Sequence, residues 1–150
     1  NSTGTSWYTG DAVGFETEAF AICDTLKYIK PPVHTICLGQ AMGTAAMILS
    51  SGAKGSRASL PHATIVLNQS RSGAQGQASD IQIRAEEVLA NKSAFLDILS
   101  SNTGQTVEKL DKDTDRMFYL TPEEAKEYGL IDRVLRSTKE LPTAIPAGVA

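Results

Sequence analysis

The segment between Gly39 and Ser51 constrains the fold of this 150-residue chain more than any other part of it. Small or apolar residues would face every side of a helix there, namely Gly43, Thr44, Ala45, Ala46, Met47, Ile48 and Leu49. A helix without a polar face has to be buried inside a protein. We therefore expect residues 39–51 to form a central helix, around which the chain packs as one domain.

Strand-like and helix-like patterns alternate on both sides of this segment. Strand patterns cover residues 33–38, 65–67 and 131–135. Helical patterns cover residues 16–29, ended by Pro31-Pro32, then 79–101, 106–111 and 121–129. Such alternation predicts an α/β fold with a parallel-rich sheet packed by helices.

Two of these helices have recognisable start signals. Ser79 with Gln82 matches a capping box, and Thr121-Pro122 followed by Glu124 combines an N-cap, a first-turn proline and an acidic N3 residue. Gly129 is placed to end the second of these helices. Residues 138–150 contain two prolines and little periodicity, so we expect a loose C-terminal tail.

Charge and residue usage exclude several classes of function. The net charge is −3 and no run of Lys or Arg predicts binding to nucleic acid or to a membrane surface. Cys23 and Cys37 lie in apolar patterns, which is typical of buried thiols. His34 and His62 show no paired ligand spacing with them, so we expect no metal site and no cofactor.

Several short motifs resemble one family in their order and spacing. They are Gly39-Gln40-Ala41, Gly52-Ala53-Lys54-Gly55, Leu60-Pro61, Gly76-Gln77-Ala78-Ser79-Asp80-Ile81, Thr103-Gly104-Gln105, Asp113-Thr114-Asp115-Arg116 and the run from Glu123 to Asp132. Over residues 1–135 the chain resembles the proteolytic subunit of the Clp protease, ClpP, of peptidase family S14. The resemblance implies a ClpP/crotonase-like βα-superhelix with a protruding strand-helix handle. It also implies a single domain over residues 1–150 whose N-terminal part precedes Asn1.

Active members of that family use a Ser-His-Asp triad, and the resemblance places its three positions at Gly43, Asn68 and Met117. Glycine has no nucleophile, an amide does not accept a proton near neutral pH, and a thioether cannot orient an imidazolium. Thr44 stands beside the lost serine, but no base is aimed at it. We therefore predict that the triad is degenerate and that the chain is not an enzyme.

The region that forms the family's oxyanion hole also differs. The family pattern Asn-Ser-Pro-Gly-Gly reads Asn1-Ser2-Thr3-Gly4-Thr5 here, so the degenerate oxyanion region comprises Gly4, Thr5 and Thr44. An insertion around Ser6 to Phe15 lengthens the chain relative to typical ClpP. Triad loss together with this insertion resembles ClpR, the inactive ClpP-like subunit of cyanobacteria and plastids. The implied location is the cyanobacterial cytoplasm or the chloroplast stroma.

The resemblance also implies partners. A ClpR-type subunit would assemble with catalytic ClpP-type and other ClpR-type subunits into stacked heptameric rings, fed by an Hsp100-type AAA+ unfoldase. Ring-to-ring contacts would come from the handle and from an acidic-Arg pair after it. Those residues are Gly73, Gln75, Gly76, Gln77, Ile83, Asp115 and Arg116.

A crotonase-superfamily acyl-CoA enzyme is the alternative, because that superfamily shares the βα-superhelix. Such enzymes stabilise a thioester enolate with two backbone amides, and the turn from Gly39 to Thr44 could supply one of them. No acidic residue is placed for this chemistry, and the C-terminal helix that covers CoA in that superfamily is missing from the pattern.

Overall fold

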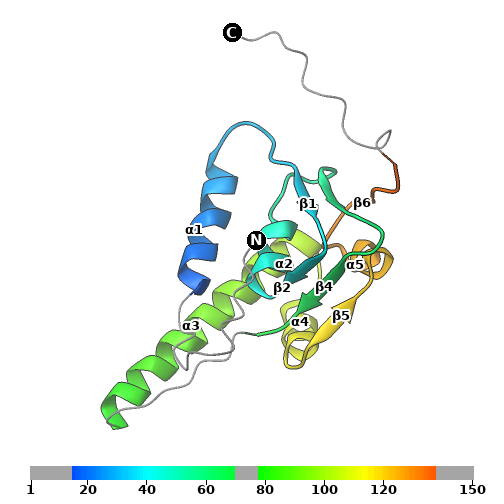
Figure 1. The fold of residues 1–150 in the computed structure, drawn as a ribbon. Coiled ribbons are helices and arrows are strands. Elements are labelled where there is room, and N and C mark those ends of the chain that lie inside the picture. The colour runs from blue at the N-terminus through cyan, green and yellow to red at the C-terminus, as the bar shows by residue number, and fades with distance from the viewer. Residues whose placement is uncertain (1–14, 70–77, 138–150) are drawn as a thin grey trace.

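The computed structural model describes residues 15–69 and 78–137, which form a mixed α/β fold with helices packed against two small sheets (Figure 1). The first sheet has the order β1-β3-β6, from β1 (Thr35–Cys37), β3 (Arg57–Ser59) and β6 (Arg133–Val134), all parallel. The second has the order β2-β4-β5, from β2 (Gln40–Met42), β4 (Thr64–Leu67) and β5 (Phe118–Leu120). In it, β2 and β4 are parallel and β5 is antiparallel. The predicted α/β class is confirmed, with two sheets in place of one.

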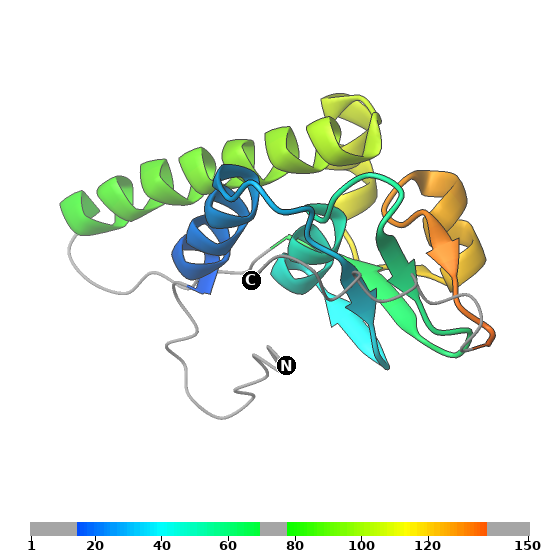
Figure 2. The ribbon, with the colours of Figure 1, turned by 90° about the horizontal axis from the view of Figure 1, so that it is seen from above.

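Five helices connect and cover these strands within the described residues: α1 (Phe15–Tyr28), α2 (Thr44–Ser50), α3 (Ala78–Thr103), α4 (Val107–Thr114) and α5 (Pro122–Tyr128). The long helix α3 runs beside α1 and extends well beyond the strands in both views (Figures 1 and 2). None of the helices in the described ranges is long and apolar enough to cross a membrane.

The central helix is shorter than its sequence predicts. It begins at Thr44, because residues 40–42 extend into β2 and pair with residues 64–66 of β4. Gly39 and Gly43 both have positive φ, at 86° and 54°, and these turns limit strand β2 at both of its ends. The predicted burial is confirmed for the helix itself, since Ala46 and Met47 are fully buried in the core.

The start of α5 confirms the predicted signal. Thr121 Oγ1 accepts a hydrogen bond from the Glu124 amide, and the Glu124 carboxylate accepts one from the Thr121 amide at 2.8 Å. Gly129 ends the helix at φ 96°, where an added Cβ would collide with the Thr103 carbonyl oxygen. The predicted cap at Ser79 is wrong in position, because α3 already begins at Ala78.

A buried ion pair joins four parts of the fold. The Arg57 guanidinium donates to both carboxylate oxygens of Asp132, at 2.9 and 2.7 Å. Its remaining nitrogen donates to the carbonyl oxygens of Ser50 and Asn102, at the ends of α2 and α3. Arg57 is only 5% exposed, so these partners satisfy a charge that would otherwise be costly to bury.

Candidate functional site

Gly43 occupies the sharp turn between β2 and α2. Its φ and ψ are 54° and −113°, a conformation that residues with a Cβ rarely adopt. The Gly43 amide donates to the Val66 carbonyl at 2.9 Å, and its own carbonyl accepts from the Met47 amide at 3.1 Å. This strand-turn-helix arrangement is the one that displays a nucleophile in many hydrolases. Here the displayed position has no side chain.

Asn68 lies directly against that turn, one residue after β4 ends. A Cβ added to Gly43 would be 2.9 Å from Asn68 Oδ1. Asn68 Nδ2 donates weakly to the Gln69 carbonyl at 3.4 Å. Asn68 Oδ1 is buried and has no hydrogen-bond donor among the residues that the structure describes. The positions predicted for nucleophile and base are therefore neighbours, and an amide oxygen faces the place where a nucleophile would project.

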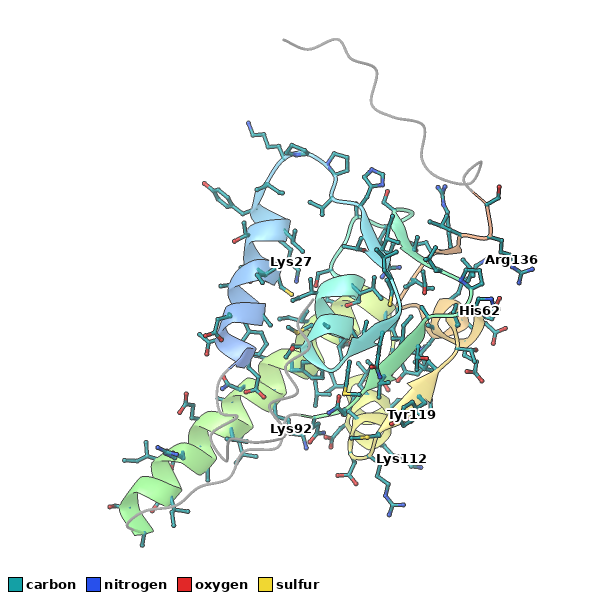
Figure 3. The ribbon with its side chains drawn as sticks, viewed as in Figure 1. Lys27, His62, Lys92, Lys112, Tyr119 and Arg136 are labelled. Atoms are coloured by element: carbon teal, nitrogen blue, oxygen red, sulfur yellow. The ribbon has the colours of Figure 1, made fainter. Side chains whose placement is uncertain are left out.

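Met117 is the third predicted triad position, and it directly precedes the antiparallel strand β5. The β4–β5 register pairs Leu67 with Phe118, so continuing it by one residue puts Met117 opposite Asn68. Met117 is half exposed, and its sulfur lies 3.5 Å from the Tyr119 hydroxyl (Tyr119 is labelled in Figure 3). The fold thus brings all three predicted positions together. Their backbone, amide and thioether groups include no nucleophile and no base for acyl transfer.

A polar network that the sequence analysis missed anchors the residue after Asn68. Gln69 Nε2 donates to Asp111 Oδ1 at 3.2 Å and to Thr114 Oγ1 at 3.1 Å. Lys92 of α3 forms an ion pair with the same Asp111 oxygen at 2.7 Å (Lys92 is labelled in Figure 3). The hydrogen bond from Lys92 lowers the pKa of the Asp111 carboxyl. No sequence motif links these residues, which come from three separate segments.

The other predicted site residues divide into two groups. Thr44 is the first residue of α2 and follows the turn directly. Ile83 is 64% exposed on α3, and Asp115 and Arg116 are exposed just after α4. Gly4 and Thr5 of the oxyanion region, and Gly73, Gln75, Gly76 and Gln77 of the predicted handle, lie outside the described residues.

The cysteines and histidines form no site in the part of the chain that the structure describes. Cys23 and Cys37 are buried and unbridged, as expected, and burial raises the pKa of both thiols. His34 and His62 are exposed (His62 is labelled in Figure 3). Across residues 15–69 and 78–137, no cluster of His, Cys, Asp and Glu could hold a metal ion.

Comparison with known proteins agrees with the motifs. Residues 12–138 match the Clp protease family. A relative from Synechocystis sp. is 83% identical over 142 residues, covering 95% of this chain and 63% of the relative. Another from Synechococcus elongatus is 75% identical over 147 residues, covering 98% and 64%. Both are named as resembling the ATP-dependent Clp protease proteolytic subunit.

A third relative is named as a proteolytic subunit itself. The ATP-dependent Clp protease proteolytic subunit 2 of Gloeobacter violaceus is 53% identical over 122 residues, covering 81% of this chain and 56% of the relative. The chain thus spans less than two thirds of the length of each of these three relatives. The match over residues 12–138 favours the Clp protease resemblance over the crotonase alternative.

Proposed function

The chain belongs to the Clp protease family, and from that premise we propose that it is a non-catalytic, ClpR-type structural subunit of an ATP-dependent Clp serine protease core. The observation that supports this proposal is the proximity of Gly43, Asn68 and Met117, the positions that the family resemblance assigns to a Ser-His-Asp triad. Loss of a triad serine alone costs roughly 10⁶-fold in rate. All three replacements together leave no route to an acyl-enzyme.

The geometry at Gly43 gives a second reason. A nucleophilic side chain would need a Cβ, and that atom would be 2.9 Å from Asn68 Oδ1 on a backbone with φ of 54°. In an active site of this kind the neighbouring side chain accepts the nucleophile's proton. The Asn68 amide fills that place with a group that does not titrate. The site therefore retains the fold of a peptidase centre without its chemistry.

The fold supports a role in assembly. We propose that residues 1–150 form a single ClpP-like domain with a βα-superhelix, and that α3 with the segment before it is the handle. α3 extends away from the strands and carries Ile81, Ile83 and Leu89, which are 40%, 64% and 65% exposed. Apolar side chains on a projecting helix fit a contact with another subunit.

The proposed partners follow from the family. They are catalytic ClpP-type and other ClpR-type subunits in stacked heptameric rings, together with an Hsp100-type AAA+ unfoldase. The subunit would need no cofactor and would act in a cyanobacterial cytoplasm or a chloroplast stroma.

Active-site labelling tests the proposal. The full-length protein, purified alone and also within its complex, is treated with a fluorophosphonate probe that captures activated serine residues. We expect label on the catalytic subunits of the complex and none on this chain. The catalytic subunits serve as the matched control, since they pass through the same purification. Probe attached to any residue of this chain would show a working nucleophile and would overturn the proposal.

A further inference from the structure

Met117 is the most exposed of the three methionines in this protein. It is 50% exposed, whereas Met42 is partly buried in β2 and Met47 is fully buried in α2. All three lie within the described residues; the loose tail predicted for residues 138–150 lies outside them and contains no methionine. A hydroperoxide oxidises a thioether by direct contact with its sulfur. The fold therefore gives three chemically equal groups very different access to such an oxidant.

A hydroxyl group lies at the Met117 sulfur. Tyr119 is two residues further along the chain, and residues two apart in an extended strand project from the same face. The Tyr119 hydroxyl donates to Met117 Sδ at 3.5 Å, and Tyr119 is itself 58% exposed (Figure 3). A thioether sulfur has two lone pairs, and this hydrogen bond engages one of them. The two lone pairs of Met117 are therefore not equivalent.

The two cysteines do not compete with Met117 for an oxidant. Cys23 is fully buried and Cys37 is 4% exposed. Burial also raises the pKa of both thiols, so that little thiolate, the reactive form of cysteine, is present. Among the sulfur atoms of this protein, that of Met117 is the one that an oxidant in solution reaches most easily.

We propose that Met117 is a modification site, where a hydroperoxide oxidises the thioether to a sulfoxide and the Tyr119 hydroxyl determines which sulfoxide epimer forms. With hydrogen peroxide, a sulfur lone pair attacks one oxygen, so that an S–O bond forms while the O–O bond breaks. The proton of the transferred oxygen passes to the departing hydroxide, which leaves as water. The sulfur loses two electrons and the peroxide gains them. Because Tyr119 engages one lone pair, oxygen bonds mainly to the other, and one epimer is in excess.

The product differs from the parent side chain in polarity and chirality, and each epimer is reduced back by its own class of methionine sulfoxide reductase. Oxidation therefore converts part of the exposed surface at Met117 and Tyr119 reversibly from apolar to polar. This inference rests on exposure and on one hydrogen bond, and it needs no assumption about catalysis or ring assembly.

Timed oxidation of the full-length protein with dilute hydrogen peroxide tests the site. Met117 begins its own tryptic peptide, since Arg116 precedes it, while Met42 and Met47 share another peptide and are distinguished by fragmentation in the mass spectrometer. We expect oxidation at Met117 to be at least about tenfold faster than at Met47, with Met42 in between. In urea, where the fold is lost, the three rates should agree within about twofold. Met42 or Met47 reacting as fast as Met117 in the folded protein would overturn the proposal. So would a preference for Met117 that persists unchanged in urea.

The ratio of the two sulfoxide epimers tests the part assigned to Tyr119. The oxidised peptide is treated separately with reductases specific for each epimer, and the remaining sulfoxide is measured. We expect at least about a threefold excess of one epimer in wild type, because one lone pair is engaged. Tyr119→Phe removes only the hydroxyl and should bring the ratio close to one. Tyr28→Phe removes a hydroxyl from a side chain that is 91% exposed on α1 and should keep the wild-type ratio. Equal epimers in wild type, or an unchanged ratio in Tyr119→Phe, would overturn the role of Tyr119.

Discussion

At the scale of single residues, two constraints meet at Gly43. The backbone has a positive φ, and Asn68 Oδ1 is buried without a donor directly beside the place of a Cβ. The family resemblance predicted a shared site for these positions from the sequence, and the structure places their residues side by side. What the sequence could not reveal is the contact itself, because residues 43 and 68 meet only after β2 pairs with β4.

Gly43→Ser and Gly43→Ala separate the two constraints. Both variants add a Cβ at a φ of 54°, which costs roughly 1–2 kcal/mol of unfolding free energy. The serine hydroxyl can also donate to Asn68 Oδ1, recovering about 1 kcal/mol. We therefore expect Ala to be the more destabilising of the two in chemical denaturation. Neither variant should cleave peptides, because Asn68 still supplies no base. Equal stability of the two variants would show that the Asn68 oxygen is not available to the hydroxyl.

The Arg57–Asp132 pair predicts a pH dependence. The hydrogen bonds from Arg57 hold the pKa of the Asp132 carboxyl below its usual value. Because the pKa is lower in the folded state, ionised Asp132 adds to the unfolding free energy. This contribution is fully present above the unfolded pKa of about 4 and is lost as pH falls through the folded pKa. Acid titration of the unfolding free energy should therefore show a decrease below about pH 4 that Asp132→Asn reduces.

Removing one partner of this buried pair also tests its role at neutral pH. We expect Asp132→Ala to cost about 3–5 kcal/mol of unfolding free energy, because the buried Arg57 charge loses its counter-charge and keeps only the Ser50 and Asn102 carbonyls. Glu123→Gln is the control, since its pair with Arg136 is exposed and should contribute little. If the two variants unfold at the same denaturant concentration, the Arg57–Asp132 pair does not stabilise the fold more than an exposed ion pair does.

At the scale of elements, prediction succeeded where a local signal was strong. The α5 cap, the buried α2 helix and α3 each carry such a signal. It failed for β2, β3 and β5, which have three residues each, too few for an alternating pattern. These strands form because they pair with strands that are distant in the sequence, and a local sequence pattern does not reveal such pairing. For the same reason the Lys92–Asp111–Gln69 network had no sequence signature.

Helix α3 offers a test of the proposed handle. Ile83→Glu/Leu89→Glu places charge on two side chains that are already 64% and 65% exposed in the single chain. We expect the unfolding free energy of the subunit to change by less than about 0.5 kcal/mol, as for ordinary surface substitutions. In native mass spectrometry of the reconstituted complex, double rings should give way to single rings. Gln82→Glu adds charge at an exposed position of the same helix and should leave double rings intact. Double rings that survive the double substitution would remove α3 from the interface.

At the scale of the whole molecule, a Clp protease family domain surrounds Gly43, Asn68 and Met117, whose side chains include no nucleophile and no general base. The β4–β5 register places Met117 opposite Asn68, and Gln69 beside Asn68 is fixed by contacts from α4. Under the proposed non-catalytic role, catalysis does not account for this ordered arrangement, since the three positions lack the needed groups. The proposed ring assembly would account for it, because the subunits of a ring have to present matching contact surfaces whether or not they cleave peptides.

We expect Asp115 and Arg116 to form part of such a contact surface in the proposed ring. Both are exposed, neither has an ion-pair partner among the described residues, and Met117, the third predicted triad position, follows them directly. Arginine presents a planar fork that suits a bidentate contact with a carboxylate on another subunit.

We expect Arg116→Ala to weaken double-ring assembly while the isolated subunit stays folded. Arg116→Lys, which keeps the charge and loses the fork, should give an intermediate defect. Because added salt screens an exposed ionic contact, the difference between wild type and Arg116→Ala should shrink as ionic strength rises. Analytical ultracentrifugation of wild type, Arg116→Ala and Arg116→Lys over a series of salt concentrations measures these differences in assembly. Assembly of Arg116→Ala that equals wild type at low salt would show that the pair is only solvated surface charge.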